Sequence, residues 1–94
     1  MKAELGDDSL PGGDLVRDGL RDLAAGREST ASLLVSIGAP KLRACGIEVP
    51  AAIDEPNLRL YRLLQRTHGD AAHSRYNALI RRLVSYERAL RCAR

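Results

Sequence analysis

The sequence contains no phenylalanine and no tryptophan, and its only aromatic residues are Tyr61, Tyr76 and Tyr86. A core without large rings must be filled by Leu, Val, Ile and Ala, which suits close packing of helices. Only Cys45 and Cys92 are available for cross-linking, and two cysteines are too few for a disulfide scaffold. We therefore expect both thiols to be reduced and the protein to be cytoplasmic.

Long apolar runs are also absent, since none approaches the roughly 18 to 20 residues needed to cross a bilayer. The first eight residues are acidic and lack the apolar stretch of a secretory signal, so we expect no membrane association. A chain of 94 residues is near the small end of what builds a self-sufficient core. We expect a flexible acidic arm over residues 1–13 and a single helical domain over residues 14–94.

Apolar residues recur at helical spacing, and no strand-like alternation is present, so the predicted fold class is all-α. We expect a compact bundle of four to five helices, with Ser29 capping the second and Asp70 capping the last. The predicted helices cover residues 14–25, 29–38, 40–45, 54–67 and about 70–92, the last being the longest, with an extended connector over residues 47–53.

The segment Leu33–Ile47 has the rhythm of a helix-turn-helix motif, with Gly38 at the turn. A recognition helix must be long enough to lie in a major groove and present several polar side chains. Gly46 would end this second helix after about two turns. The sequence therefore favours an ordinary corner between two helices over a DNA-reading motif.

The last predicted helix carries a continuous apolar stripe on one side. Ala72, Tyr76, Leu79, Ile80, Leu83 and Leu90 form this stripe at 100° per residue. Glu87 falls near its middle, where an unpaired buried charge would be costly. We expect Glu87 to lie at an edge of the core and to pair with Arg91.

The opposite side of the same helix carries a row that we call the small-residue seam, formed by Ser74, Ala78, Ser85, Ala89 and Cys92. Small side chains allow two helix backbones to approach closely, and arginines flank the row on both margins. The partner of this seam would be the acidic N-terminal helix of the same chain or another subunit. The predicted partner-binding residues of the last two helices are Arg59, Arg62, Arg66, Arg75, Ala78, Arg81, Arg82, Ser85, Arg88 and Ala89.

His68, Asp70 and His73 lie close together in the sequence and are ligand types that zinc accepts. Because Asp70 is also placed to cap a helix, we expect a structural role for it and keep a metal or catalytic site as an alternative. The chain shows no nucleophile–base arrangement and no Gly-rich phosphate loop. We therefore expect no enzymatic activity, no cofactor and no metal.

Charge is divided unevenly along the chain. Residues 1–55 carry six basic and ten acidic residues (net −4), and residues 56–94 carry nine arginines against two acids (net +7). This pattern presents one basic surface to a partner. Together with the small size, the absence of a catalytic set and the seam of the last helix, it favours a small regulatory module (an adaptor, inhibitor or antitoxin-like protein) that binds a partner protein and self-associates, as a homodimer. The alternative is nucleic-acid binding through the arginine faces of the last two helices, although lysines and stacking aromatics are scarce.

Overall fold

The computed structural model describes residues 10–92, and none of these residues lies in a strand, which confirms the all-α class. Within this range, no helix is long and apolar enough to pass through a membrane. The helical elements are α1 (Gly13–Ala24), α2 (Thr30–Ala44), α3 (Pro56–His68), a 3₁₀ turn η1 (Gly69–Ala71) and α4 (Ala72–Cys92).

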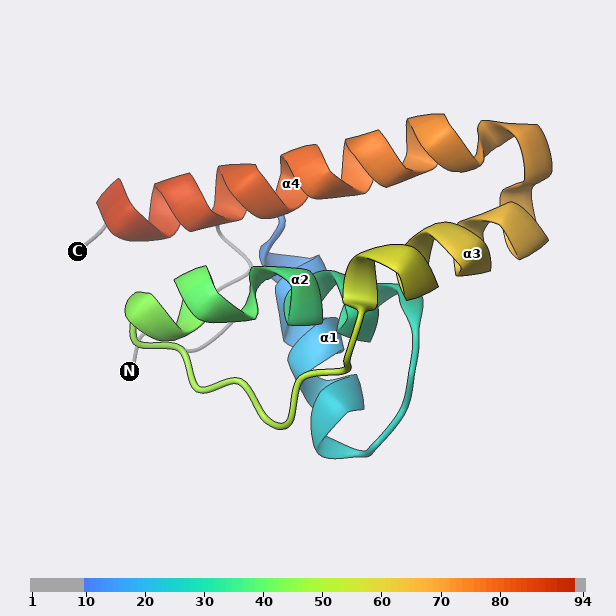
Figure 1. Cartoon of the computed structure of the whole chain (residues 1–94). Coiled ribbons are helices and arrows are strands. Elements are labelled where there is room, and N and C mark those ends of the chain that lie inside the picture. Colours follow the sequence, from blue (N-terminus) through green and yellow to red (C-terminus); the bar gives the residue numbers. More distant parts are fainter. Residues whose placement is uncertain (1–9, 93–94) are drawn as a thin grey trace.

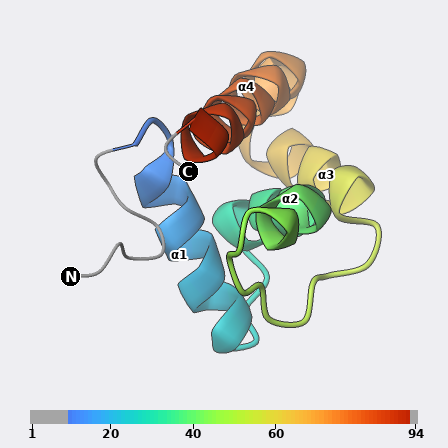
Figure 2. The same ribbon diagram turned by 90° about the vertical axis from the view of Figure 1, so that its left-hand side faces the viewer.

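α2 lies at the centre of the arrangement and packs against each of the other three α-helices. In Figure 1, α4 runs along the top of the molecule and α3 returns beneath it as the other arm of a helical hairpin. Viewed along α4, α2 lies between α1 and α3 (Figure 2). The core between these helices is formed by aliphatic side chains and Tyr86, in agreement with the composition.

α1 and α2 cross at very short range. A Cβ atom added to Gly19 would clash with the carbonyl oxygen of Ala31 and with Cγ2 of Val35. Because one of these neighbours is backbone, glycine is required at this crossing. The apolar side of α1, including the fully buried Val16, is thereby brought onto α2.

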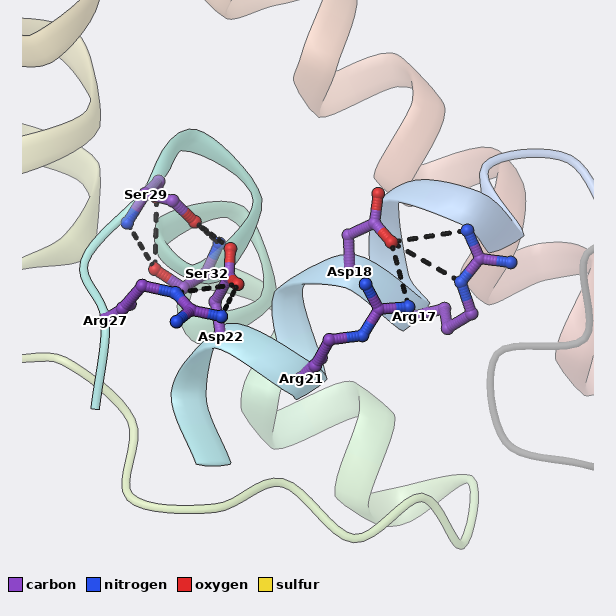
Figure 3. Close-up of polar contacts among 7 residues, drawn as sticks. All are labelled: Arg17, Asp18, Arg21, Asp22, Arg27, Ser29 and Ser32. Atoms are coloured by element: carbon purple, nitrogen blue, oxygen red, sulfur yellow. Dashed lines mark hydrogen bonds and ion pairs between the residues drawn. The ribbon is translucent and has the colours of Figure 1, made fainter. Parts of the chain in front are cut away.

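The junction between α1 and α2 is fixed by polar contacts (Figure 3). Ser29 caps α2 as predicted, because its side chain accepts from the Ser32 amide while the Ser32 hydroxyl accepts from the Ser29 amide. The Ser29 hydroxyl donates to Oδ2 of Asp22 at 2.6 Å, and Arg27 contacts Oδ1 of the same carboxylate at 3.2 Å. Asp22 therefore ties the end of α1 to the start of α2.

The prediction of separate helices over residues 29–38 and 40–45 was wrong. α2 continues through Pro40 to Ala44, so neither a helix-turn-helix nor a corner forms in Leu33–Ile47. Gly38 was expected to end the helix, but it is buried inside α2 because α4 approaches it closely. Packing on both sides of this position keeps the chain helical despite the two unfavourable residues.

Residues 47–53 form a connector without helix or strand, as predicted. Ile47 and Val49 anchor it to the core, where they are 5% and 7% exposed. At its far end the Ile53 amide donates to the hydroxyl of Ser36 at 3.0 Å. The connector is therefore anchored at Ile47, Val49 and Ile53.

α3 begins at Pro56, two residues later than predicted, because Glu55 adopts a left-handed conformation with φ 49° just before it. Asp70 does not cap the last helix, since it lies inside η1 and α4 starts at Ala72. Gly69, with φ 55° and ψ −120°, allows the sharp reversal between the two helices. Residues 56–92 are thus 37 consecutive helical residues that reverse direction at Gly69, and residues 10–92 contain three continuous helical segments instead of four to five.

Of the predicted flexible arm, residues 1–9 lie outside the described residues. Leu10 packs against the core, and Gly13 is already the buried first residue of α1. Gly12 has φ 78°, and a Cβ there would lie 2.7 Å from the carbonyl oxygen of Arg82. The turn Leu10–Gly12 is therefore packed directly against α4.

Replacing Leu83, which is 4% exposed and contacts the surface of α2 at Gly38, removes buried apolar volume from the core. We expect Leu83→Ala to lower the free energy of unfolding by about 2–4 kcal/mol, measured by urea denaturation. Leu58→Ala is the matched control, because Leu58 is 46% exposed and should cost less than about 0.5 kcal/mol. Equal midpoints for the two variants would place Leu83 outside the core.

Asp22 makes stability sensitive to acid. The Ser29 hydrogen bond, assisted by Arg27, holds the pKa of this carboxyl below its usual 3.8 although burial acts in the opposite direction. A lowered folded-state pKa contributes stability above 3.8 that is lost as the pH falls through the folded value. We expect Asp22→Asn to be less stable than the parent at neutral pH and equally stable in strong acid. Acid titration of the helical circular dichroism signal measures this, with the exposed Asp70→Asn as control.

Candidate functional site

The outer face of α4 carries most of the small-residue seam. Ser74, Ala78, Ser85 and Cys92 are exposed, and Ala89 is half-buried. α1 packs mainly on α2, but the turn just before it, at Pro11 and Gly12, borders a hollow together with Ala78 and Ser85. The start of the N-terminal helix therefore lies beside the seam, and the partner of the seam stays a prediction.

One arginine at the margin of the seam is bound to the N-terminal half of the chain. Nη2 of Arg82 lies 3.1 Å from Oδ1 of Asp14 at the start of α1. Beside this pair, a shallow hollow of about 620 Å³ is bordered by the turn at Pro11 and by Ala78, Arg81 and Ser85. Arg75, Arg81 and Arg88 are exposed and form no ion pair within residues 10–92. The seam is thus a groove-like surface with uncompensated positive charge.

The arginines of α3 form a second, separate group. Arg59 pairs with Glu28 at 3.1 Å, and a hollow of about 250 Å³ beside it is bordered by Arg62, Arg66 and the acidic Glu55. None of these residues borders the hollow next to the seam. The ten predicted binding residues therefore fall on two surfaces, and each surface has an arginine bound to an acid of the N-terminal half.

His68, Asp70 and His73 do not assemble into a metal site. No three His, Cys, Asp or Glu side chains among residues 10–92 are grouped so that they could hold a metal ion. His73 instead lies with Nε2 3.2 Å from the Asn77 amide nitrogen, and its ring meets Tyr61 edge-on at 6.5 Å. These three residues lie at the end of the helical hairpin and are not grouped as a three-ligand site requires.

The inner face of α4 differs from the predicted stripe at two positions. Tyr86, which the stripe omitted, is 1% exposed, and Glu87 is only 5% exposed although its carboxylate oxygens still reach solvent. Leu83 and Ala72 are buried as predicted, while the other members of the stripe are half-buried. The helical pattern alone does not distinguish these cases, because the depth of a side chain depends on what α2 presents opposite it.

Glu87 reaches this depth because α2 presents Gly38 to it. A Cβ at Gly38 would lie 2.9 Å from Oε2 of Glu87, so the glycine leaves space that the carboxylate occupies. Glu87 forms no ion pair with Arg91, contrary to expectation, nor any hydrogen bond within residues 10–92. Burial raises the pKa of Glu87 above its usual 4.5, while the charges of Lys41 and Arg91 act in the opposite direction.

The ionised form of Glu87 should destabilise the fold. A folded-state pKa above 4.5 means that the folded chain holds this proton more tightly, so stability falls as the pH rises through the folded value. We expect Glu87→Gln to be at least as stable as the parent at about pH 7, with the difference shrinking towards about pH 4. Urea denaturation at both pH values measures this. A large loss of stability in the neutral variant would show that the charge itself holds the fold together.

Neither the sequence nor the structure of this chain connects these sites to a characterised protein: no protein-family model, curated protein or solved structure matches it. The candidate sites are therefore defined by their residues alone. They are the arginine-flanked seam on the outside of α4 and the buried carboxylate on its inside.

Proposed function

We propose that the protein is a small helical interaction module that binds an acidic helix of a partner protein through the outer face of α4. The observation that carries this proposal is the exposure of Ala78 and Ser85, which border a hollow beside the turn at Pro11 and Gly12. Small side chains let a second helix approach closely, and arginines on both margins then meet acids of that helix.

Charge complementarity favours an acidic helix over a second copy in symmetric contact. A two-fold pairing of α4 with α4 would bring Arg81 and Arg88 of one copy close to the same residues of the other. Like charges at such close range are destabilising. Self-association through this face stays a prediction, and it requires the acidic N-terminal half of one copy to meet the basic half of the next.

The distribution of arginines supports protein binding more than nucleic-acid binding. Phosphate recognition needs one continuous basic surface, whereas the arginines of α3 and α4 border different hollows. Acids are interspersed among them: Glu28 pairs with Arg59, and Asp14 pairs with Arg82. None of the three tyrosines alternates with these arginines on the outer face, since Tyr86 is buried and the others are half-buried.

A designed peptide tests the surface directly. The probe is a helical peptide of roughly 20 residues with Ala and Ser along one stripe and Glu on both margins, labelled for fluorescence anisotropy. We expect the peptide to bind the protein, with an affinity that falls as salt screens the exposed ion pairs. The Ala78→Arg substitution places a large side chain in the seam, and we expect it to lower the affinity at least tenfold. Ala24→Arg, at the exposed end of α1, is the matched control and should bind normally.

The same peptide with Lys in place of Glu is the charge-reversed control. Equal binding of the two peptides, or binding that Ala78→Arg leaves unchanged, would refute the proposal. Light scattering of the protein alone tests whether a second copy of the chain binds to the seam. A salt-insensitive dimer that Ala78→Arg converts to a monomer would show that the seam belongs to a second copy instead.

A further inference from the structure

A pocket lies between the C-terminal half of α2 and the last turns of α4. It measures about 370 Å³ and is lined by Lys41, Ala44, Cys45, Glu87 and Arg91. This volume is near the lower end of the range for small-molecule sites in proteins, roughly 300–1,000 Å³. A second hollow of about 230 Å³ adjoins it and shares Lys41 and Glu87 as lining residues. The pocket is on the inner side of α4 and contains no residue of the small-residue seam.

Glu87 gives the pocket a carboxylate that is a strong hydrogen-bond acceptor and has no donor bound to it within residues 10–92. The residue is 5% exposed, and its carboxylate forms no hydrogen bond or ion pair in this part of the chain, so its oxygens reach solvent only through the pocket. A carboxylate so largely withdrawn from water gains from a donor that enters beside it. Gly38 holds this one in place by leaving space for Oε2 on the surface of α2.

Two cations stand at the same pocket. Lys41 and Arg91 are exposed, form no ion pair within residues 10–92, and are close enough to Glu87 to lower its pKa against the effect of burial. A lone amine entering the pocket would meet these two positive charges, and a lone carboxylate would meet Glu87. A ligand that carries both groups complements all three side chains at once.

We propose that this pocket binds a free α-amino acid with a small aliphatic side chain. Its ammonium group donates to Glu87, its carboxylate accepts from Lys41 and Arg91, and its side chain lies against Ala44 and Cys45. An ammonium group has three donors and a guanidinium group can hold both oxygens of a carboxylate, so each charged end has a suitable partner. This site is independent of the proposed peptide-binding surface, since the two lie on opposite sides of α4.

The test uses the full-length protein and three matched probes. L-leucine is compared with isoamylamine, which is leucine without its carboxylate, and with isocaproic acid, which is leucine without its ammonium group. Calorimetry gives the affinities, and two-dimensional NMR reports the backbone amides. We expect leucine to bind and to shift the signals of Ala44 and Cys45, and each analogue to bind at least tenfold more weakly, because each lacks one set of charge-assisted hydrogen bonds.

Variants of the protein assign the two ends of the ligand. We expect Glu87→Gln to lower the leucine affinity at least tenfold, with a dispersed NMR spectrum showing that the variant is folded. Glu48→Gln, which changes an exposed carboxylate on the connector, should leave the affinity unchanged. Arg91→Gln should lower the affinity for leucine but not for isoamylamine, because isoamylamine has no carboxylate for Arg91 to bind. Arg91 is exposed, so this second test does not disturb the core.

Three results would overturn the proposal. The first is the absence of shifts at Ala44 and Cys45 with leucine up to about 10 mM, which corresponds to a negligible affinity. The second is equal binding of leucine and isoamylamine, which would make the pocket a simple cation site. The third is equal binding of leucine and isocaproic acid. This result would mean that the ammonium group adds nothing and that protonated Glu87 acts as a hydrogen-bond donor.

Discussion

α2 is the helix on which the other three pack, and this position constrains its side chains more than those of any other element. Ser32, Ser36, Gly38 and Ala39 are all buried on it. Small residues there allow α1 and α4 to approach the backbone of α2 closely, as the contact of Gly38 with Leu83 and Glu87 shows. The lack of phenylalanine and tryptophan is consistent with this arrangement, because large rings would separate the helices.

Local sequence patterns predicted the helices well wherever the local preference and the tertiary packing agree. Ser29 starts α2 through a complete capping box, and this could be read from residues adjacent in the sequence. Pro40 shows where such reading fails. A proline and a glycine two residues before it are strong local breaks, yet α2 continues because its buried surface is contacted by α4 from more than forty residues away.

Some features of the candidate sites could likewise be predicted from the sequence, and others could not. Periodicity alone places Ala78 and Ser85 on the side of α4 opposite the core, and both are exposed. The depth of Glu87 could not be predicted, because it depends on a glycine of another helix. The ion pairs of Arg82 with Asp14 and of Arg59 with Glu28 likewise join residues 68 and 31 positions apart, and no pattern in the sequence specifies such pairs.

The order of the packed helices has a consequence for folding kinetics. α1 packs on α2, α2 on α3 and α3 on α4, so most of the tertiary surface forms between neighbours in the chain. The pairing of α2 with α4 and the contacts of the N-terminal turn and Asp14 with α4 join elements farther apart. Bringing neighbours in the chain together costs little loop-closure entropy. Chains with mainly local contacts fold on the order of microseconds to milliseconds. The small, aromatic-poor core is therefore compatible with rapid assembly, because its elements meet without a long search.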